Sequence, residues 1–440
     1  MELVVVKFGG SSVADGRQLR KVRDIVHGDP RRKIIVVSAP GKRGTDDAKL
    51  TDLLYLCHDM AAIGTDFSAP FSLIRQRFAA IITDLALPAD LLEDIDLFAD
   101  QLLSSCSRDH AASRGEYFSA RLVAAYLGAR FVDPAEGIVI AADGRVAPES
   151  YQLLGSLFSN RNTRYVMAGF YGRDRKGEVK TFSRGGSDIS GAIAARAAGA
   201  VLYENWTDTP GILMADPRIV ADPLPITEIS FREIREMAYM GASVFHDEAI
   251  LPLREAGIPI RIKNTNQPDA PGTLITPRLS EVTITGTEIA GIAGRKDFAM
   301  LSLEKTLMNR EVGYVQRLLG ILSEYGISFE HCPSSIDSVS VIVDKTSLTS
   351  QLETVVEQIH RRLAPDNLTI TEDLALVAVV GEGMIETIGI AGKIFTALGQ
   401  AGINVRIINQ GASEINIIIG VAAGDYEKAV QALYSAFIEG

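Results

Sequence analysis

The sequence predicts an α/β protein in which a mostly parallel sheet is sandwiched by helices and is followed by two small ferredoxin-like βαββαβ units. Over residues 1 to about 290, apolar strand-like runs alternate with helix-like segments, the order typical of a parallel sheet with crossover helices. Beyond about residue 295 the pattern changes, and one motif of strands and helices occurs twice. The length of 440 residues also favours two or three domains over a single core.

In the first part, strands are predicted from short runs that are apolar on both faces. These runs are residues 2–6, 33–38, 164–170 and 200–204, and helices are predicted over 115–127 and 187–198 and from Asp15 onward. Lys7, Ser38 and Gly169 lie at the carboxyl ends of three of these strands. Because ligands of open parallel sheets gather beyond the carboxyl ends of the strands, we expect a binding site there.

The C-terminal part contains an internal repeat at an offset of about 76 positions. The offset pairs Met308 with Met384, Gly313 with Gly389, Gly326-Ile327 with Gly402-Ile403, and residues 339–343 with 415–419. In each copy a predicted helix, 312–325 or 388–401, precedes the Gly-Ile pair, and a second helix follows the apolar strand. Each copy is therefore predicted to be a βαββαβ unit.

Composition limits the possible partners. A hydrophobic content of 47% and a charged content of 22% are values of a globular protein. The formal charge of −11 argues against a nucleic-acid or anionic-membrane surface, since either needs a dominant basic face. No apolar run approaches the length of a membrane span. Cys57, Cys106 and Cys332 lie far apart and predict buried free thiols, as in a reducing cytosol.

The first motif with chemical content is Lys7-Phe8-Gly9-Gly10-Ser11-Ser12. Paired glycines let backbone N–H groups approach an anion, and the lysine adds a charge that can follow a phosphoryl group. Ser11 and Ser12 are expected to cap the following helix, whose N-terminus favours the same anion. The spacing is not that of a P-loop, and a plain turn with a solvated lysine remains an alternative.

Two further clusters follow. In residues 181–188, Arg184 offers a planar fork suited to a carboxylate, Gly185-Gly186 allow close backbone approach, and Ser187 or Asp188 is expected to cap a helix. The alternative is an ordinary capped helix with a surface arginine. Residues 206–212 and 215–218 contain polar groups for a nucleotide but also Asp-Pro and Pro-Gly steps, which are common in loops.

Together these motifs closely resemble the signatures of aspartate kinases (aspartokinases). The matching stretches are residues 7–13, 183–188, and 206–212 with 216–218, in that order and followed by the tandem repeat. The family joins an amino-acid-kinase domain to two C-terminal ACT domains, and the resemblance covers nearly the whole chain. It implies a catalytic domain over residues 1–290, a first ACT domain over 297–372 and a second over 373–440.

The resemblance also implies roles for individual residues. The catalytic residues would be Lys7, Arg184 and Asp188. The ATP-binding residues would be Lys7, Gly9, Gly10, Ser11, Thr207, Asp208, Gly211, Asp216 and Arg218. The residues that bind aspartate would be Ser38, Thr51, Glu116, Phe170, Arg184 and Ser187. Glu116 would pair with the α-ammonium; without the family it reads equally well as a solvated glutamate early in a helix.

The implied reaction converts ATP and L-aspartate to ADP and 4-phospho-L-aspartate, the first step of lysine, threonine and methionine biosynthesis. A β-carboxylate is already ionised at neutral pH, so it can attack the γ-phosphorus without a general base. Catalysis then depends on positioning and on neutralising charge. Mg²⁺ is expected to accompany ATP and to be held mainly by phosphates, with no protein metal site.

Two features depart from the family pattern. Many relatives have a lysine where this chain has Ser243. There are two alternatives for Arg261 and Lys263: one of them supplies the missing charge, or both are solvated strand residues. The nearby His246 is expected to be structural. The loop over residues 41–49 is also longer and more polar than in some relatives.

In related aspartokinases, the first ACT unit binds the inhibitory amino acid. The matching residues are Met308, Gly313, Ser328, Phe329, Glu330, Ser334 and Ser335. Glu330 would pair with an amino group, and lysine is favoured over threonine as the effector. A homodimer or homotetramer formed through the ACT domains, in the cytoplasm, is expected. Two other functions stay open: a kinase for glutamate, acetylglutamate or a nucleoside monophosphate, and a metabolite sensor with an inactive kinase domain.

Overall fold

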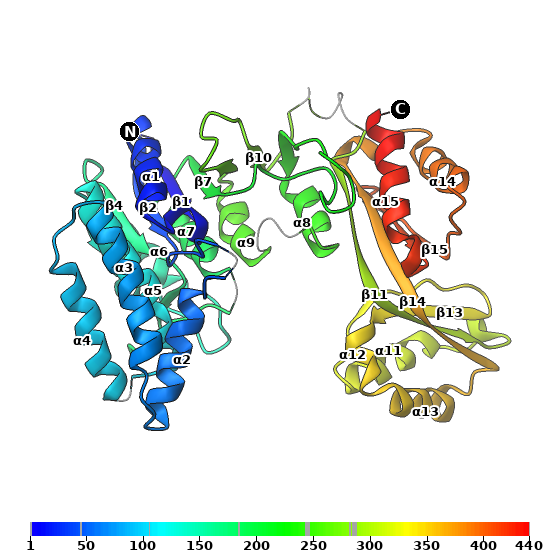
Figure 1. Ribbon diagram of the computed structural model, residues 1–440. Helices are drawn as coiled ribbons and strands as arrows, with labels where there is room; N and C mark the ends of the chain where they lie inside the picture. Colours follow the sequence, from blue (N-terminus) through cyan, green and yellow to red (C-terminus); the bar gives the residue numbers. More distant parts are fainter. Residues whose placement is uncertain are drawn as a thin grey trace. The chain divides into compact units, whose positions relative to one another are not determined.

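The computed structural model describes residues 2–44, 46–104, 106–183, 185–242, 247–280, 283 and 288–439. The chain divides into two compact units (Figure 1). The first comprises Met1–Ile212, Pro225–Phe231 and Ser243–Leu279, and the second comprises Leu213–Leu224, Arg232–Ala242 and Ser280–Gly440. Among the described residues, no helix is long and apolar enough to cross a membrane.

The first unit is built on an eight-stranded sheet with the order β3-β4-β2-β1-β7-β9-β10-β8. Its strands are β1 (Val4–Phe8), β2 (Arg32–Val37), β3 (Arg130–Val132), β4 (Tyr165–Ala168), β7 (Leu202–Thr207), β8 (Glu228–Ser230), β9 (Ile260–Asn264) and β10 (Thr273–Thr276). Neighbouring strands are parallel except for β9 and β10. A separate hairpin is formed by β5 (Tyr171–Arg173) and β6 (Val179–Thr181). The predicted mostly parallel sheet is confirmed.

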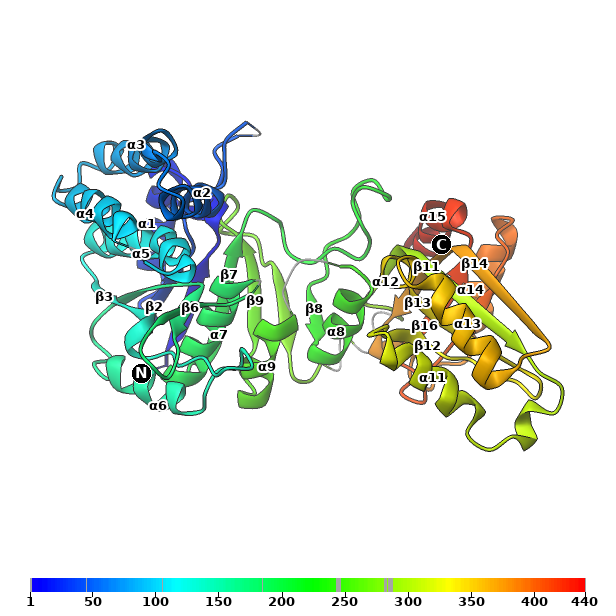
Figure 2. The same cartoon turned by 90° about the horizontal axis from the view of Figure 1, so that it is seen from below.

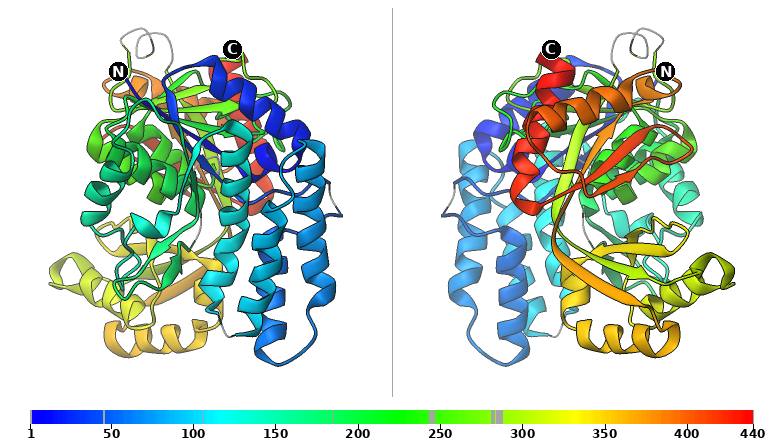
Figure 3. Two further views of the ribbon diagram at one scale, coloured as in Figure 1. Left: turned by 90° about the vertical axis from the view of Figure 1, so that its left-hand side faces the viewer. Right: turned by 90° about the vertical axis from the view of Figure 1, so that its right-hand side faces the viewer.

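Helices cover both faces of this sheet, as Figure 2 shows. One layer consists of α1 (Gly16–Gly28), α2 (Leu50–Ala62), α3 (Ser68–Asp84), α4 (Leu91–Leu103) and α5 (Arg108–Leu127), and it shares an apolar core with β1, β2 and β4. The other contains α6 (Glu149–Leu157), α7 (Gly186–Ala198) and α9 (Asp247–Ala256). Helices α2 to α5 stand side by side as a bundle (Figure 3, left).

The residues that cap the N-termini of α1 and α7 differ from those expected. Ser11 and Ser12 do not cap α1; they lie in a short 3₁₀ helix, η1 (Gly10–Val13), and the Asp15 carboxylate instead accepts from the N–H of Gln18 at 2.8 Å. At α7 no side chain caps the helix, since the N-cap is Gly185 with φ +59°. Neither Ser187 nor Asp188 therefore has the predicted capping role, which leaves both side chains available for other contacts.

The second unit contains a six-stranded antiparallel sheet with the order β12-β13-β11-β14-β16-β15. Its strands are β11 (Gly291–Glu304), β12 (Phe329–His331), β13 (Ser338–Asp344), β14 (Asn367–Val380), β15 (Ile407–Asn409) and β16 (Asn416–Val421). Its helices include α8 (Phe231–Tyr239), α11 (Tyr314–Glu324), α12 (Lys345–Thr349), α13 (Leu352–Leu363), α14 (Ile390–Gln400) and α15 (Tyr426–Tyr434). Its single-turn helices are η3 (Met308–Arg310), η4 (Glu382–Met384) and η5 (Ala423–Asp425).

The two copies of the repeat share this sheet through the long central strands β11 and β14. The first copy runs β11-α11-β12-β13-α13-β14. In the second copy, β14, α14, β15, β16 and α15 follow one another, and the edge beside β14 is completed by the first half of β11. Helices α14 and α15 lie side by side (Figure 3, right). The predicted boundary between residues 372 and 373 falls inside β14 and remains a prediction.

Candidate active site

Lys7 is turned away from the apolar core of its own strand. Val4, Val6 and Phe8 face the core shared with α1 to α5, so the alternation of a strand directs Lys7 to the opposite face, which α7 covers. There the Lys7 Nζ lies 2.6 Å from Oδ1 of Asp188, in the first turn of α7. Lys7 is only 7% exposed. The two glycine motifs are thus joined by one ion pair.

Asn205 is a third member of this group, and the sequence motifs did not identify it. It pairs with Lys7 in the register between β1 and β7, and its Nδ2 donates to Oδ1 of Asp188 at 3.0 Å. Asp188 is therefore held by an ammonium and an amide at once. The predicted strand ended at residue 204, one position before Asn205, whereas β7 continues to Thr207 and buries this amide, and a buried polar side chain needs a partner.

The glycine turn after β1 is braced from two sides. The N–H of Gly9 donates to the carbonyl oxygen of Trp206 at 3.0 Å, and the hydroxyls of Ser12 and Thr265 lie 2.7 Å apart. On the other side, the N–H of Gly41 donates to the carbonyl of Gly10 at 2.8 Å, and a Cβ built on Gly10 would come within 3.1–3.4 Å of residues 39 and 41. A side chain at position 10 would be tightly packed against the backbone of residues 39 and 41, which favours glycine there.

The ends of β2 and β4 bring further predicted residues to the same edge. The N–H of Ser38 donates to the carbonyl of Phe8 at 3.1 Å. Phe170 adopts φ +77°, and its N–H donates to Oγ of Ser190 in α7 at 3.0 Å. A Cβ on Gly186 would lie 2.6 Å from the Phe170 ring, so the aromatic ring is pressed against the start of α7. A bulky residue at positive φ is a costly conformation that clusters at functional sites.

Glu116 lies in the middle of α5 and is 6% exposed. Its Oε2 has no hydrogen-bond partner among the described residues. Burial raises the pKa of this carboxyl to about 7, although the Ala39 N–H and the Lys7 ammonium oppose the shift. A buried carboxylate with an unused oxygen is arranged to accept a cationic group from a ligand.

Two other residues that are predicted to bind the substrate aspartate, Thr51 and Ser187, lie at the starts of helices. Thr51 is the second residue of α2 and is half-buried. Ser187 is the second residue of α7. It lies so close to Gly169 that a Cβ built on Gly169 would be 2.7 Å from the Cβ of Ser187. Arg184, Ser243 and His246 fall outside the described residues, so nothing is said of their positions.

The predicted nucleotide residues beyond β7 are divided between the two compact units. Thr207 ends β7, and its hydroxyl donates to the exposed Asp208 at 3.2 Å. Gly211 follows at φ +131°. Asp216 and Arg218 belong to the other compact unit, where they form an ion pair at 2.6 Å. Their predicted roles therefore gain no geometric support within the first unit.

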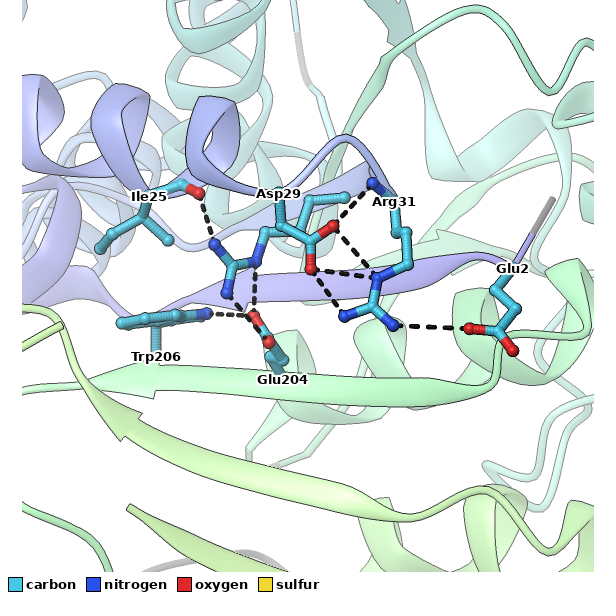
Figure 4. Close-up of polar contacts among 7 residues, drawn as sticks. Glu2, Ile25, Asp29, Arg31, Glu204 and Trp206 are labelled. Carbon is cyan, nitrogen blue, oxygen red and sulfur yellow. Dashed lines mark hydrogen bonds and ion pairs between the residues drawn. The ribbon is translucent and has the colours of Figure 1, made fainter. Parts of the chain in front are cut away.

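A buried ion pair lies on the face of the sheet opposite Lys7 (Figure 4). Arg32 donates to Glu204 at 2.9 and 3.1 Å and to the carbonyl of Ile25 at 2.5 Å, while Nε1 of Trp206 donates to Glu204 at 2.9 Å. The Lys263 Nζ lies 5.1 Å from the centre of the Trp206 ring, and burial lowers the pKa of this lysine. Lys263 is therefore a half-buried partner of Trp206 rather than a solvated residue.

In the second unit, the predicted effector residues form two adjacent turns and one strand. η3 lies beside the turn before β13, because the N–H of Asn309 donates to the carbonyl of Ile336 at 3.1 Å. Glu330, in β12, is already engaged. It accepts a hydrogen bond from the Tyr239 hydroxyl at the end of α8, and Nη2 of Arg295 lies 3.7 Å from its carboxylate. Sequence reasoning gave no sign of these partners, which are distant in the chain.

Comparison with known proteins places this arrangement in a family. The description of the amino acid kinase family matches residues 2–264, and that of the ACT domain matches residues 377–437. The chain is 40% identical to aspartokinase 3 of Bacillus subtilis (strain 168) over 99% of both sequences. The chain belongs to the aspartokinase family. It is also 32% identical to the lysine-sensitive aspartokinase 3 of Escherichia coli (strain K12) over the full length of both.

Solved structures of aspartokinases support the same family assignment. The crystal structure of Clostridium acetobutylicum aspartate kinase matches with a TM-score of 0.93 and 47% identity, over 99% of this chain and 100% of that one. The structure of Escherichia coli aspartokinase III in complex with aspartate and ADP matches with a TM-score of 0.75 and 30% identity, over 99% of both. The predicted family, fold class and enzyme class are confirmed, so neither alternative function is retained.

Proposed function

We propose that this aspartokinase transfers the γ-phosphoryl group of ATP to the β-carboxylate of L-aspartate at the edge of the sheet where Lys7 meets α7. The observation that carries this proposal is the Lys7–Asp188 ion pair, because it joins the glycine turn after β1 to the N-terminus of α7. The N-terminus of α7 presents backbone N–H groups and the positive end of a helix dipole there, beside the Lys7 ammonium. A phosphoryl group in transfer needs such an environment.

The glycine turn and Lys7 are proposed to bind the phosphates. Lys7 is held by Asp188, which is itself fixed by Asn205, so its ammonium needs no reorganisation when charge develops. The attacking oxygen belongs to an ionised β-carboxylate, the new bond joins it to the γ-phosphorus, and the bond to the bridging oxygen of ADP breaks. The residues proposed for the nucleotide are Lys7, Gly9, Gly10, Ser11, Thr207, Asp208, Gly211, Asp216 and Arg218.

Aspartate is proposed to lie between the ends of β2 and β4 and the starts of α2 and α7. Glu116 has an unpartnered oxygen suited to the α-ammonium, and Arg184 has a fork suited to a carboxylate. Phe170, pressed against α7, would shape the pocket. The side chains proposed to hold aspartate are Ser38, Thr51, Glu116, Phe170, Arg184 and Ser187.

Magnesium is proposed to enter as part of the ATP substrate. Mg²⁺ binds through one or two carboxylates and substrate phosphates rather than through a cage of protein ligands. Among the described residues, no three or more His, Cys, Asp or Glu side chains are grouped for a metal. The phosphate oxygens of ATP are therefore proposed to hold the cation. Asp188 is the carboxylate that pairs with Lys7 at this site.

The second unit is proposed to regulate the enzyme. One of the similar Escherichia coli structures is described as a complex with lysine and aspartate in a T-state, and a lysine-type effector at the turns near η3 would suit this chain as well. We also propose a homodimer or homotetramer formed through the ACT domains and a cytoplasmic location. Fully exposed Ile388 and nearly fully exposed Val312, equivalent positions in the two copies, support burial of these turns by another subunit.

A coupled assay of ADP release tests the proposal. The acceptors are aspartate, glutamate, N-acetylglutamate and a nucleoside monophosphate, and hydroxylamine traps any acyl phosphate as a hydroxamate. We expect turnover with aspartate and a hydroxamate in proportion to ADP. Absence of turnover with aspartate, or equal turnover with glutamate, would contradict the proposal.

A further inference from the structure

Arg77 is an unusual residue in the helical layer of the first unit. It lies on α3, where every other buried residue is apolar, and it is only 3% exposed. Its Nη2 donates to the carboxylate of Asp47 and, at 3.0 Å, to the carbonyl of Ala48. Its Nε and Nη1 are buried without a hydrogen-bond partner among the described residues. A buried guanidinium with unused donors is costly, so stability alone gives little reason for a charge here.

The partner of Arg77 belongs to the segment that crosses the proposed active site. Asp47 also accepts from the backbone N–H and the Nε of Arg43, at 3.0 and 3.1 Å. The hydrogen bonds from Arg43 and the nearby Arg77 charge lower the pKa of Asp47 to about 2. The carboxylate is therefore ionised at every pH at which a kinase is assayed. Asp47 thus connects Arg43 with Arg77 on α3.

The other end of the segment touches the catalytic groups. The N–H of Gly41 donates to Gly10, and a Cβ on Gly41 would lie 2.6 Å from the Gly10 carbonyl carbon. Two residues earlier, the N–H of Ala39 interacts with the Glu116 carboxyl. Immediately after Ala48, α2 begins, and its second residue is Thr51. The segment thus connects the phosphate turn with two proposed aspartate contacts.

We propose that Arg77 is a positioning residue of the kinase reaction, which acts through Asp47 and Ala48 on the segment from Ser38 to Thr51. Without this anchor the segment keeps its contact with Gly10 but loses the fixed point just before α2. The distance between Thr51 and the Gly10 turn would then vary. A displacement of about 1 Å can lower the reaction rate on the order of 100-fold. The inference rests on the proposed function, since it assumes that Gly10 and Thr51 face the two substrates.

The test uses Arg77→Met in the full-length protein, which removes the guanidinium but keeps an unbranched apolar side chain. Because Asp47 keeps its two hydrogen bonds from Arg43 and a buried guanidinium with unpaired donors is lost, we expect a melting temperature close to that of the wild type. We expect kcat/KM for aspartate to fall by about tenfold or more. A merely structural ion pair would not produce this combination, because its loss would lower stability and activity together.

Arg75→Met is the matched control. Arg75 lies on the same helix, is exposed and pairs with Asp96, so its loss should leave both kinetic constants within about twofold. Asp47→Asn should lower kcat/KM as Arg77→Met does, and adding it to Arg77→Met should cause no further loss, because both act through one contact. If Arg77→Met behaves like Arg75→Met, or if its activity falls only in step with its folded fraction, the inference is wrong. A wild-type enzyme that does not phosphorylate aspartate would instead contradict the proposed function.

Discussion

Replacing Glu116 with glutamine should make the free enzyme more stable at alkaline pH while weakening its binding of aspartate. Burial raises the pKa of the Glu116 carboxyl from its usual 4.5 to about 7. At pH 8 the folded protein must hold a charge that burial disfavours, and each pKa unit corresponds to about 1.4 kcal/mol. The wild type is therefore destabilised by about 3 kcal/mol at pH 8, and a neutral amide removes this penalty.

The pH dependence follows from the sign of the shift. A carboxyl whose pKa is raised on folding favours the folded state most below the unfolded pKa of 4.5, and that benefit is lost as pH rises through about 7. The gain from Glu116→Gln should thus be largest at pH 8 and less than about 1 kcal/mol at pH 5. For a unit of this size, 1 kcal/mol shifts the melting temperature by about 2–4 °C. Thermal denaturation of both proteins from pH 5 to 8 measures the difference.

The same substitution should raise KM for aspartate by about 10- to 100-fold, because a charge-assisted hydrogen bond to the ammonium is lost. In the wild type, KM for aspartate should fall as pH rises through 7, since only the carboxylate form pairs with the ammonium. Glu149→Gln is the control, because Glu149 is an exposed glutamate in the same unit. If the gain in stability is the same at pH 5 and pH 8, or if KM for aspartate does not change, the reasoning on Glu116 is wrong.

Three further changes test other contacts. Lys7→Ala should lower kcat by about 100-fold and should also lower the melting temperature, because Asp188 is left buried with Asn205 as its remaining partner; a coupled ADP assay with near-normal kcat would refute the role of Lys7. Glu204→Ala should lower the free energy of unfolding by about 3–5 kcal/mol, because Arg32 is left buried without its carboxylate; urea denaturation that shows no loss would contradict this. Tyr239→Phe removes the hydrogen bond to Glu330 and should change the inhibition constant for lysine or threonine at least about threefold while sparing kcat without effector. Unchanged inhibition would exclude that link.

Elements that depend on the local pattern of apolar residues were predicted correctly, whereas contacts between residues distant in the chain were not. Strands in the first unit were predictable because buried strands of a parallel sheet are short, continuous apolar runs, and helices were predictable from the helical spacing of their apolar residues. The starts of helices were predicted less well. Ser11 and Ser12 looked like caps, but the chain makes an extra turn first, and Asp15 takes the role. At α7 a glycine at positive φ begins the helix, so Asp188 is free to reach Lys7.

In the second unit, the repeat was predicted from the sequence, but the pairing between its two copies was not. The repeat was visible because equivalent glycines and apolar strands recur at one offset, and the structure confirms its helices and strands. The sharing of β11 and β14 by the two copies could not be read from the sequence, because it depends on pairing between residues that are 63 (Glu304 and Asn367) to 89 (Gly291 and Val380) positions apart. The engagement of Glu330 by Tyr239, across 91 positions, was hidden for the same reason.

The sequence by itself determined the class of fold, the glycine turn after the first strand, the paired glycines at the start of α7 and the family. Each of these is encoded locally, in the spacing of apolar residues and in glycines that only a close backbone approach requires. Tertiary structure alone decided that Asn205 holds Asp188, that Glu116 is buried with an unused oxygen and that Arg77 anchors the segment before Thr51. These facts depend on burial and on pairs of side chains that folding brings together, and no local pattern records either.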